Sequence, residues 1–262
     1  MNPLFDAHCH LQDERLTPTI PTVMERAAKA GVTDLMCCGT CESDWPAVIN
    51  VAARFPGVHI SLGLHPWFIA DRTTKWLDTL QGLLRDHPAA VGEIGLDHAL
   101  PKETFADQEA VFLAQLSLAA KLERPVSVHC RRAWGRMMEL LDGHGWPPGG
   151  ILFHSYSGGP DLVWPLARRG AYFSFSGSIT HDNNKRGREA VIVVPEDRLL
   201  IETDSPDIMP ALTTDHSSNS NPLNEPANLT YIATTIATLR HWTPPRTATL
   251  THQNAKAFFS LR

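Results

Sequence analysis

The stretch Leu4-Phe5-Asp6-Ala7-His8-Cys9-His10 decides how the rest of the chain is interpreted. A short apolar run leads into two histidines that are separated by one residue. On a β-strand, side chains two residues apart point to the same face, so His8 and His10 would project together. Two imidazoles on one face can share a divalent first-row metal ion. A single His-x-His motif is weak evidence, and its meaning depends on the other segments of the chain.

The same alternation of a short apolar run and an amphipathic segment recurs along the chain. The runs predict eight strands, at 4–9, 34–38, 58–63, 90–96, 125–130, 150–154, 171–176 and 198–203. The amphipathic segments predict helices at 21–30, 44–54, 73–85, 104–121, 133–141, 161–169, 183–194, 225–240 and 245–259. Eight strand–helix units in about 250 residues are typical of a (β/α)8 TIM barrel. We therefore expect a single α/β barrel domain over residues 1–262, with a doubly wound sheet as the structural alternative.

The composition restricts the classes of protein and partner. The chain has 262 residues, of which 43% are hydrophobic and 19% charged, as in soluble globular proteins. Its net charge of −5 gives no overall attraction for nucleic acid or anionic membranes, so an anionic substrate has to be attracted locally. No apolar run is long enough to cross a bilayer, and the N-terminus lacks a signal-peptide pattern. The five cysteines favour reduced thiols, and we expect a cytoplasmic monomer without an obligate protein partner.

Polar side chains stand at the ends of the predicted strands, where a barrel has its active site. A buried imidazole or carboxylate is costly unless it is paired or bound to a metal ion. Taken singly, each of these residues has an ordinary explanation as a core histidine or an ion-pair partner. Their joint position at the ends of five separate strands indicates a metal site. The residues are His8, His10, Glu93, His129, His154 and Asp204.

A series of motifs in the same order resembles the TatD family of metal-dependent hydrolases. The resemblance runs from residue 5 to about residue 259. It implies a somewhat distorted (β/α)8 barrel and a deoxyribonuclease that hydrolyses phosphodiester bonds, acting exonucleolytically in the 3′–5′ direction on DNA with single-stranded ends. The motifs are Asp6-Ala7-His8-Cys9-His10, Gly63-Leu64-His65-Pro66, Gly92-Glu93-Ile94-Gly95-Leu96-Asp97, Val128-His129-Cys130-Arg131, Phe153-His154-Ser155-Tyr156-Ser157-Gly158, Phe175-Ser176-Gly177, Glu202-Thr203-Asp204-Ser205-Pro206 and Asn224-Glu225-Pro226.

The resemblance also implies two divalent ions. One ion would be held by His8, His10 and Asp204, and the second by His129 and His154. Glu93 would bridge the two. Ions roughly 3.5–4 Å apart can share a carboxylate and bind a phosphoryl oxygen, which makes Glu93 and Asp204 the catalytic candidates, with Asp204 as proton acceptor. Such ligands suit Mg²⁺, Mn²⁺ or Zn²⁺, and the sequence does not choose among them.

His65 and Arg131 are the candidate substrate-binding residues. His65 either reaches the substrate or caps a loop. Arg131 either clamps a phosphate or forms an ion pair with a carboxylate such as Glu202 or Asp97. The loop from Pro206 to Pro226 is long enough to be functional. The segment from Lys185 to Arg188 would meet phosphates or form a solvated helix face.

The chain departs from the family pattern around the expected substrate. His98 replaces an aromatic residue, Arg132 replaces an acidic one, and Ser220-Asn221-Pro222-Leu223 replaces a basic stretch. These differences leave the substrate open between DNA and a small-molecule ester, amide or phosphoester. A non-catalytic binding barrel is disfavoured, because the set of six expected ligands is complete.

Overall fold

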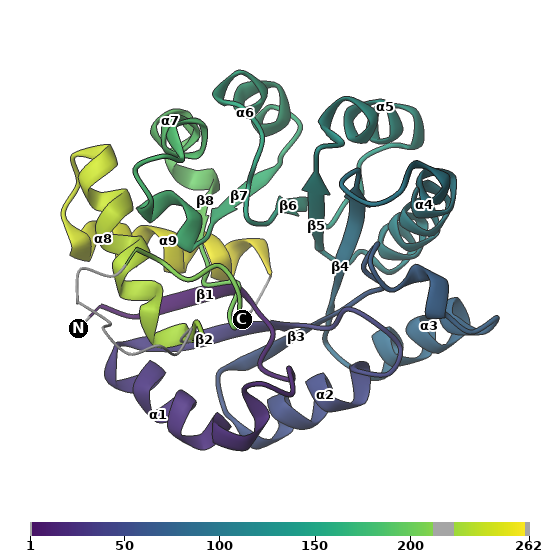
Figure 1. Cartoon of the computed structure of the whole chain (residues 1–262), viewed down its shortest axis with the longest axis horizontal. Coiled ribbons are helices and arrows are strands. Elements are labelled where there is room, and N and C mark those ends of the chain that lie inside the picture. Colours follow the sequence, from purple (N-terminus) through teal and green to yellow (C-terminus); the bar gives the residue numbers. More distant parts are fainter. Residues whose placement is uncertain (1, 212–222, 260–262) are drawn as a thin grey trace.

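Eight parallel strands form one sheet in the order β1 to β8, alternating with helices on the outside (Figure 1). This computed structural model describes residues 2–211 and 223–259. The predicted (β/α)8 architecture is confirmed. The strands are β1 (Leu4–Cys9), β2 (Val32–Cys38), β3 (Val58–Leu62), β4 (Ala90–Asp97), β5 (Val126–Arg131), β6 (Ile151–Phe153), β7 (Tyr172–Phe175) and β8 (Leu199–Ile201). The α-helices are α1 (Ile20–Lys29), α2 (Trp45–Arg54), α3 (Trp76–Asp86), α4 (Phe105–Leu122), α5 (Trp134–His144), α6 (Pro160–Ala167), α7 (Lys185–Val193), α8 (Leu229–Arg240) and α9 (Pro244–Phe258).

The local sequence explains where these elements form. The strands of a parallel barrel are covered on both faces, so their sequences are mostly apolar. In β4, for example, every residue is buried. Helices α1, α2, α6 and α9 each carry proline in their first turn, where the missing N–H costs nothing. The predicted start at Glu225 was too early, because Pro226–Asn228 form a 3-10 turn before α8 begins at Leu229.

The seam between β8 and β1 is irregular. The two strands are joined beyond the end of β8, where the Asp204 N–H donates to the His8 carbonyl at 2.9 Å. The His10 N–H donates to the Ser205 carbonyl at 2.7 Å. The register of β1 against β2 also shifts between Asp6 and Cys9. The barrel is therefore distorted beside the first two histidines.

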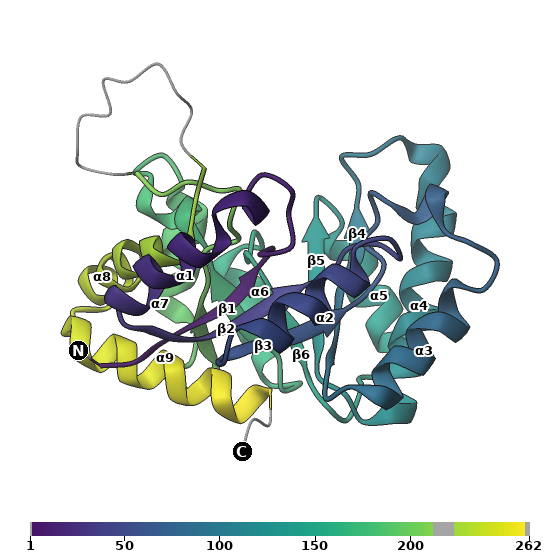
Figure 2. The same cartoon turned by 90° about the horizontal axis from the view of Figure 1, so that it is seen from below.

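Helix α9 closes one end of the barrel, beneath the strands in Figure 2. Its apolar side chains pack against the interior residues of the strands, which leaves the opposite end for polar side chains. The buried cluster at the closed end contains Phe5, Ala7, Met36, Cys38, Ala90, Leu152, Leu200, Ala255, Phe258 and Phe259.

Two further expectations concern cysteines and membranes. The five cysteines are free thiols, as expected, and Cys37 and Cys38 are fully buried at the end of β2. Among the helices of residues 2–211 and 223–259, none has the length and apolar character needed to cross a membrane.

Candidate metal centre

Glu93 lies at the centre of the site, at the barrel end opposite α9, with only 4% of its surface exposed. Its Oε2 lies 3.2 Å from His8 Nε2 and 3.6 Å from His10 Nε2. Its Oε1 lies 3.0 Å from His129 Nδ1 and 2.7 Å from His154 Nε2. The two oxygens of one carboxylate thus divide four histidines, from three different strand ends, into two pairs.

Glycines in β4 allow this close approach. Gly95 has φ +149°, and a Cβ at this position would lie 1.9 Å from the His129 carbonyl oxygen. Only glycine tolerates both the backbone conformation and the contact. The absence of a side chain at Gly95 therefore lets β4 and β5 come together and places His129 beside Glu93.

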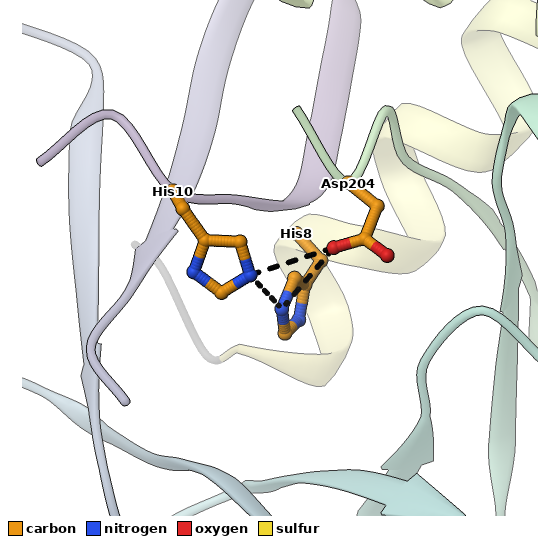
Figure 3. A group of neighbouring side chains, drawn as sticks. All are labelled: His8, His10 and Asp204. Atoms are coloured by element: carbon orange, nitrogen blue, oxygen red, sulfur yellow. Dashed lines mark hydrogen bonds and ion pairs between the residues drawn. The ribbon is translucent and has the colours of Figure 1, made fainter. Parts of the chain in front are cut away.

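Asp204 lies beside the first pair of histidines, His8 and His10 (Figure 3). One of its oxygens, Oδ1, lies 3.4 Å from His10 Nε2 and 3.9 Å from His8 Nε2, while the other oxygen points away from both rings. The preceding Thr203 is held by buried Asp6, whose carboxylate accepts the Thr203 N–H at 2.8 Å and its hydroxyl at 2.5 Å. These contacts anchor the turn that presents Asp204 to the end of β1.

The outer ring nitrogens of the same four histidines face acceptors of the protein. When an outer nitrogen donates its proton, the inner nitrogen keeps a free lone pair for a cation, as in most histidine metal sites. The inner nitrogens are those that face Glu93. The outer pairs are His8 Nδ1 with Ser127 Oγ at 3.2 Å, His10 Nδ1 with the Cys38 carbonyl at 2.8 Å, His129 Nε2 with Asp97 Oδ2 at 3.4 Å, and His154 Nδ1 with Glu202 Oε1 at 3.5 Å.

His154 provides a test of whether a cation fits. Both of its ring nitrogens are buried and lack a properly oriented hydrogen bond within residues 2–211 and 223–259. Its Nε2 is nevertheless only 2.7 Å from Glu93 Oε1. Leaving buried polar atoms unsatisfied is costly, and an ion shared by His154 Nε2 and Glu93 Oε1 would give that nitrogen a partner. The nitrogen and oxygen donors present here fit divalent first-row cations and Mg²⁺.

The charges of the site are coupled. Burial favours a higher pKa for Glu93, but the nearby His154, His65 and His8 outweigh it and hold the pKa well below its usual value. Burial also opposes ionisation of Asp204, whose contacts with His10 and other imidazoles lower its pKa to about 2. Burial disfavours a charged His154, yet Glu93 and Glu202 raise its pKa well above the usual value. Protons on histidines thus balance the acids, and a bound cation would displace them.

His65 differs from the other four histidines. Its Nδ1 accepts the backbone N–H of Trp67 at 3.1 Å, so the neutral ring carries its proton on Nε2. This Nε2 lies 3.2 Å from Glu93 Oε1, where it donates rather than binds a cation. Burial lowers the pKa of His65 to about 4, which favours the neutral ring. His65 therefore caps its loop and orients Glu93 at the same time.

A cleft of about 1030 Å³ opens above these residues. Arg131 lines it with 53% of its side chain exposed, and its guanidinium lies 3.8 Å from Asp97. Of the two carboxylates expected as partners, Asp97 is therefore the neighbour. Glu202 instead accepts the Ser155 N–H and the Ser174 hydroxyl from the adjacent strand ends.

Sequence reasoning missed several residues of the site. Asp6, Ser127 and Glu202 are polar residues within apolar strands, and that position was the available signal. Arg186 lines the cleft, in the segment that was expected either to meet phosphates or to form a solvated helix face. Of the positions that depart from the family pattern, His98 and Arg132 are not among the cleft-lining residues, and residues 220–222 lie outside the described residues.

A family model described as "TatD related DNase" matches residues 5–260. The chain belongs to this family. The TatD resemblance and the class of metal-dependent hydrolase, both predicted from the motifs, are thereby confirmed.

Relatives of the TatD family cover nearly the whole chain. The chain is 30% identical to "Uncharacterized metal-dependent hydrolase YabD" of Bacillus subtilis, over 98% of this chain and 99% of the relative. It is 32% identical to "3'-5' ssDNA/RNA exonuclease TatD" of Salmonella typhimurium, again over 98% and 99%. Among solved structures, the TatD homologue YJJV of Escherichia coli superposes with a TM-score of 0.90 at 27% identity, over 99% of this chain and 98% of the other.

Proposed function

We propose that this protein is a two-metal exonuclease that removes nucleotides from the 3′ ends of single-stranded DNA. The observation that carries the proposal is that the two carboxylate oxygens of Glu93 face two different pairs of histidines. Its Oε2 faces His8 and His10, and its Oε1 faces His129 and His154. A carboxylate shared in this way suits two neighbouring cations better than a set of hydrogen bonds, because each inner nitrogen is left with a lone pair.

In this assignment His8, His10 and Asp204 would hold one ion and His129 and His154 the other, and Glu93 would offer one oxygen to each group of ligands. Mg²⁺, Mn²⁺ and Zn²⁺ are all compatible with these nitrogen and oxygen ligands. When bound, a pair of divalent ions polarises a phosphoryl oxygen and lowers the pKa of a water molecule.

The side chains of the chain account for the remaining steps. Asp204, ionised at neutral pH, accepts the proton of the attacking water on the oxygen that points away from the histidines. The water oxygen bonds to phosphorus, the bond from phosphorus to the 3′ oxygen of the preceding nucleotide breaks, and that oxygen takes up a proton from solvent while Asp204 returns the accepted proton to solvent. Arg131, at the rim of the cleft, holds the charged phosphate by a bidentate contact.

The surroundings of the cleft favour an anionic, single-stranded substrate. Arg131 and Arg186 line its wall, although the chain as a whole carries a charge of −5, whereas a third arginine there, Arg15, is paired with Asp13 and Asp207. Local cationic side chains of this kind track a phosphate backbone. Relatives that carry the name 3′–5′ ssDNA/RNA exonuclease support the choice of strand ends and add RNA as a second substrate.

The test is degradation of a 5′-labelled single-stranded oligonucleotide in the presence of Mg²⁺, Mn²⁺ or Zn²⁺. We expect a ladder of products shortened from the 3′ end, and a loss of at least about a hundredfold in rate for Glu93→Gln. Glu109→Gln, which alters a partly exposed ion pair between α4 and Arg136 of α5, is the matched control. Intact substrate with all three ions, or equal rates for Glu93→Gln and the wild type, would contradict the proposal.

The alternative substrate, a small-molecule ester, amide or phosphoester, is distinguished by a panel of chromogenic compounds. If one of them is turned over orders of magnitude faster than DNA, and Glu93→Gln abolishes that turnover, the metal centre stands and the nucleic-acid assignment is replaced.

A further inference from the structure

Trp67 occupies a distinctive place in the cleft. It follows His65 and Pro66 in the loop after β3, lines the cleft, and leaves 54% of its surface exposed. Exposure alone means little, because isolated apolar side chains are common on protein surfaces. Trp164 on α6 is exposed to 51% and is not among the cleft-lining residues. The contacts of Trp67, rather than its exposure, set it apart.

The indole of Trp67 is held in one orientation. Its Nε1–H donates to Asp97 Oδ2 at 2.7 Å, and Asp97 is fully buried. The ring also packs nearly perpendicular to His65, with 5.1 Å between ring centroids and 88° between ring planes. A polar contact at one edge and a packed neighbour fix the ring while much of its surface stays open to the cleft.

The indole of Trp67 is separated from Glu93, at the candidate metal centre, by the side chain of His65. His65 packs against the indole, and His129 lies 6.5 Å away by ring centroids. Both histidines contact Glu93 Oε1, at 3.2 and 3.0 Å. A nucleotide whose phosphate reaches Glu93 would therefore bring its base into the neighbourhood of the indole.

Resting on the proposed function, we propose that Trp67 is a binding subsite that stacks on the base of the 3′-terminal nucleotide. Every base has a π face, so an aromatic platform accepts any sequence, which suits an exonuclease. The base of an unpaired end is free to stack in this way, whereas the terminal base of a duplex is already paired and stacked. The subsite thus supplies a physical reason for a preference for single-stranded ends.

The test compares two 5′-labelled oligonucleotides that are identical except at the 3′ end. One ends in an ordinary nucleotide, and the other ends in an abasic tetrahydrofuran unit. KM and kcat are measured for the wild type, Trp67→Ala, Trp67→Phe and Trp164→Ala, and the metal content of each protein is determined. We expect the wild type to bind the ordinary end more tightly, by about tenfold in KM, since loss of one stacked base weakens binding by about 5- to 150-fold.

The variants separate stacking from a structural role. Trp67→Ala should raise KM for the ordinary end about tenfold, leave the abasic substrate nearly unchanged, and so erase the preference. Trp67→Phe keeps an aromatic face but loses the N–H, and should retain most of the preference. Trp164→Ala should behave like the wild type.

Two results would overturn the subsite. One is a wild-type preference retained by Trp67→Ala, and the other is an equal loss on both substrates together with loss of metal, which would place the effect on Asp97 and His129. If the wild type shortens neither oligonucleotide with any of the three ions, the proposed function fails first and the subsite falls with it.

Discussion

At the residue scale, His65 and His129 contact the same oxygen of Glu93, but their other ring nitrogens face different partners. The outer nitrogen of His129 faces a carboxylate, Asp97, whereas that of His65 accepts the N–H of Trp67. An imidazole that faces a donor on one side must carry its proton on the other. His129 is therefore suited to bind a cation, and His65 is suited to donate to Glu93.

This difference leads to a prediction about metal content. His65→Gln should retain the full number of bound ions and lose about tenfold in activity, because it removes a contact that orients Glu93. His129→Gln should lose one ion per chain. Elemental analysis of both purified variants, loaded with Mn²⁺ under the same conditions, makes the comparison. Loss of an ion from His65→Gln would show that His65 is a ligand and that its tautomer is the other one.

At the scale of elements, one partly buried carboxylate connects α9 to the strands that it covers. Asp34 on β2 contacts His59 Nε2 of β3 at 3.0 Å, and His252 Nε2 and Lys256 Nζ of α9 at 3.0 and 3.1 Å. Burial would raise the pKa of Asp34, but these three partners outweigh it and hold the pKa well below the usual value. The group lies far along the barrel from the cleft-lining residues and has a structural role.

Asp34→Asn should lower the free energy of unfolding at pH 7 by about 1–3 kcal/mol, since it leaves charged or polar partners of α9 unpaired. A depressed native pKa adds stability above the ordinary carboxyl pKa of about 3.9, and this contribution is lost as the pH falls toward the native pKa. The difference between the variant and the wild type should therefore be smaller at pH 3, below the ordinary carboxyl pKa, than at pH 7.

Urea denaturation at the two pH values measures both quantities. Asp142→Asn, in an exposed ion pair on the surface, should change stability by no more than about 0.5 kcal/mol at either pH. A pH-independent effect of Asp34→Asn would show that the loss comes from packing rather than from charge.

At the scale of the whole molecule, the candidate metal centre brings together residues from five strands of the barrel. Its expected ligands come from within β1, β4 and β5 and from the residues that follow β1, β6 and β8, so ions held there would connect segments that are separated by nearly two hundred residues. Anything that binds the native state and not the unfolded state stabilises the fold. The irregular seam between β1 and β8, where His8, His10 and Asp204 meet, should gain most from such a connection.

Removal of metal should therefore lower the melting temperature. At a free ion concentration one hundred times the Kd, a single site adds about 2.7 kcal/mol, which corresponds to several degrees in a chain of this size. Calorimetry before and after chelation, followed by addition of Mn²⁺, measures the shift. Glu93→Gln should show little or none of it. An identical melting temperature in all states of the wild type would argue against ions in this centre.

The sequence alone was sufficient for the architecture and for the choice of residues that the structure brings together around Glu93. Apolar periodicity is a local property, and the predicted strands and helices differ from the structure only by a few residues at their ends. The carboxyl ends of parallel strands meet at one end of a barrel. For this reason the sequence was enough to predict that His8, His10, Glu93, His129 and His154 lie near one another.

Tertiary structure decided what the rim residues do. The division of the Glu93 oxygens, the proton on His65 Nε2 and the orientation of Trp67 each depend on a partner from another loop or strand. A sequence specifies which side chains are present, but the position of a proton on an imidazole depends on the group that faces it. Those facing groups are assembled only when the barrel closes.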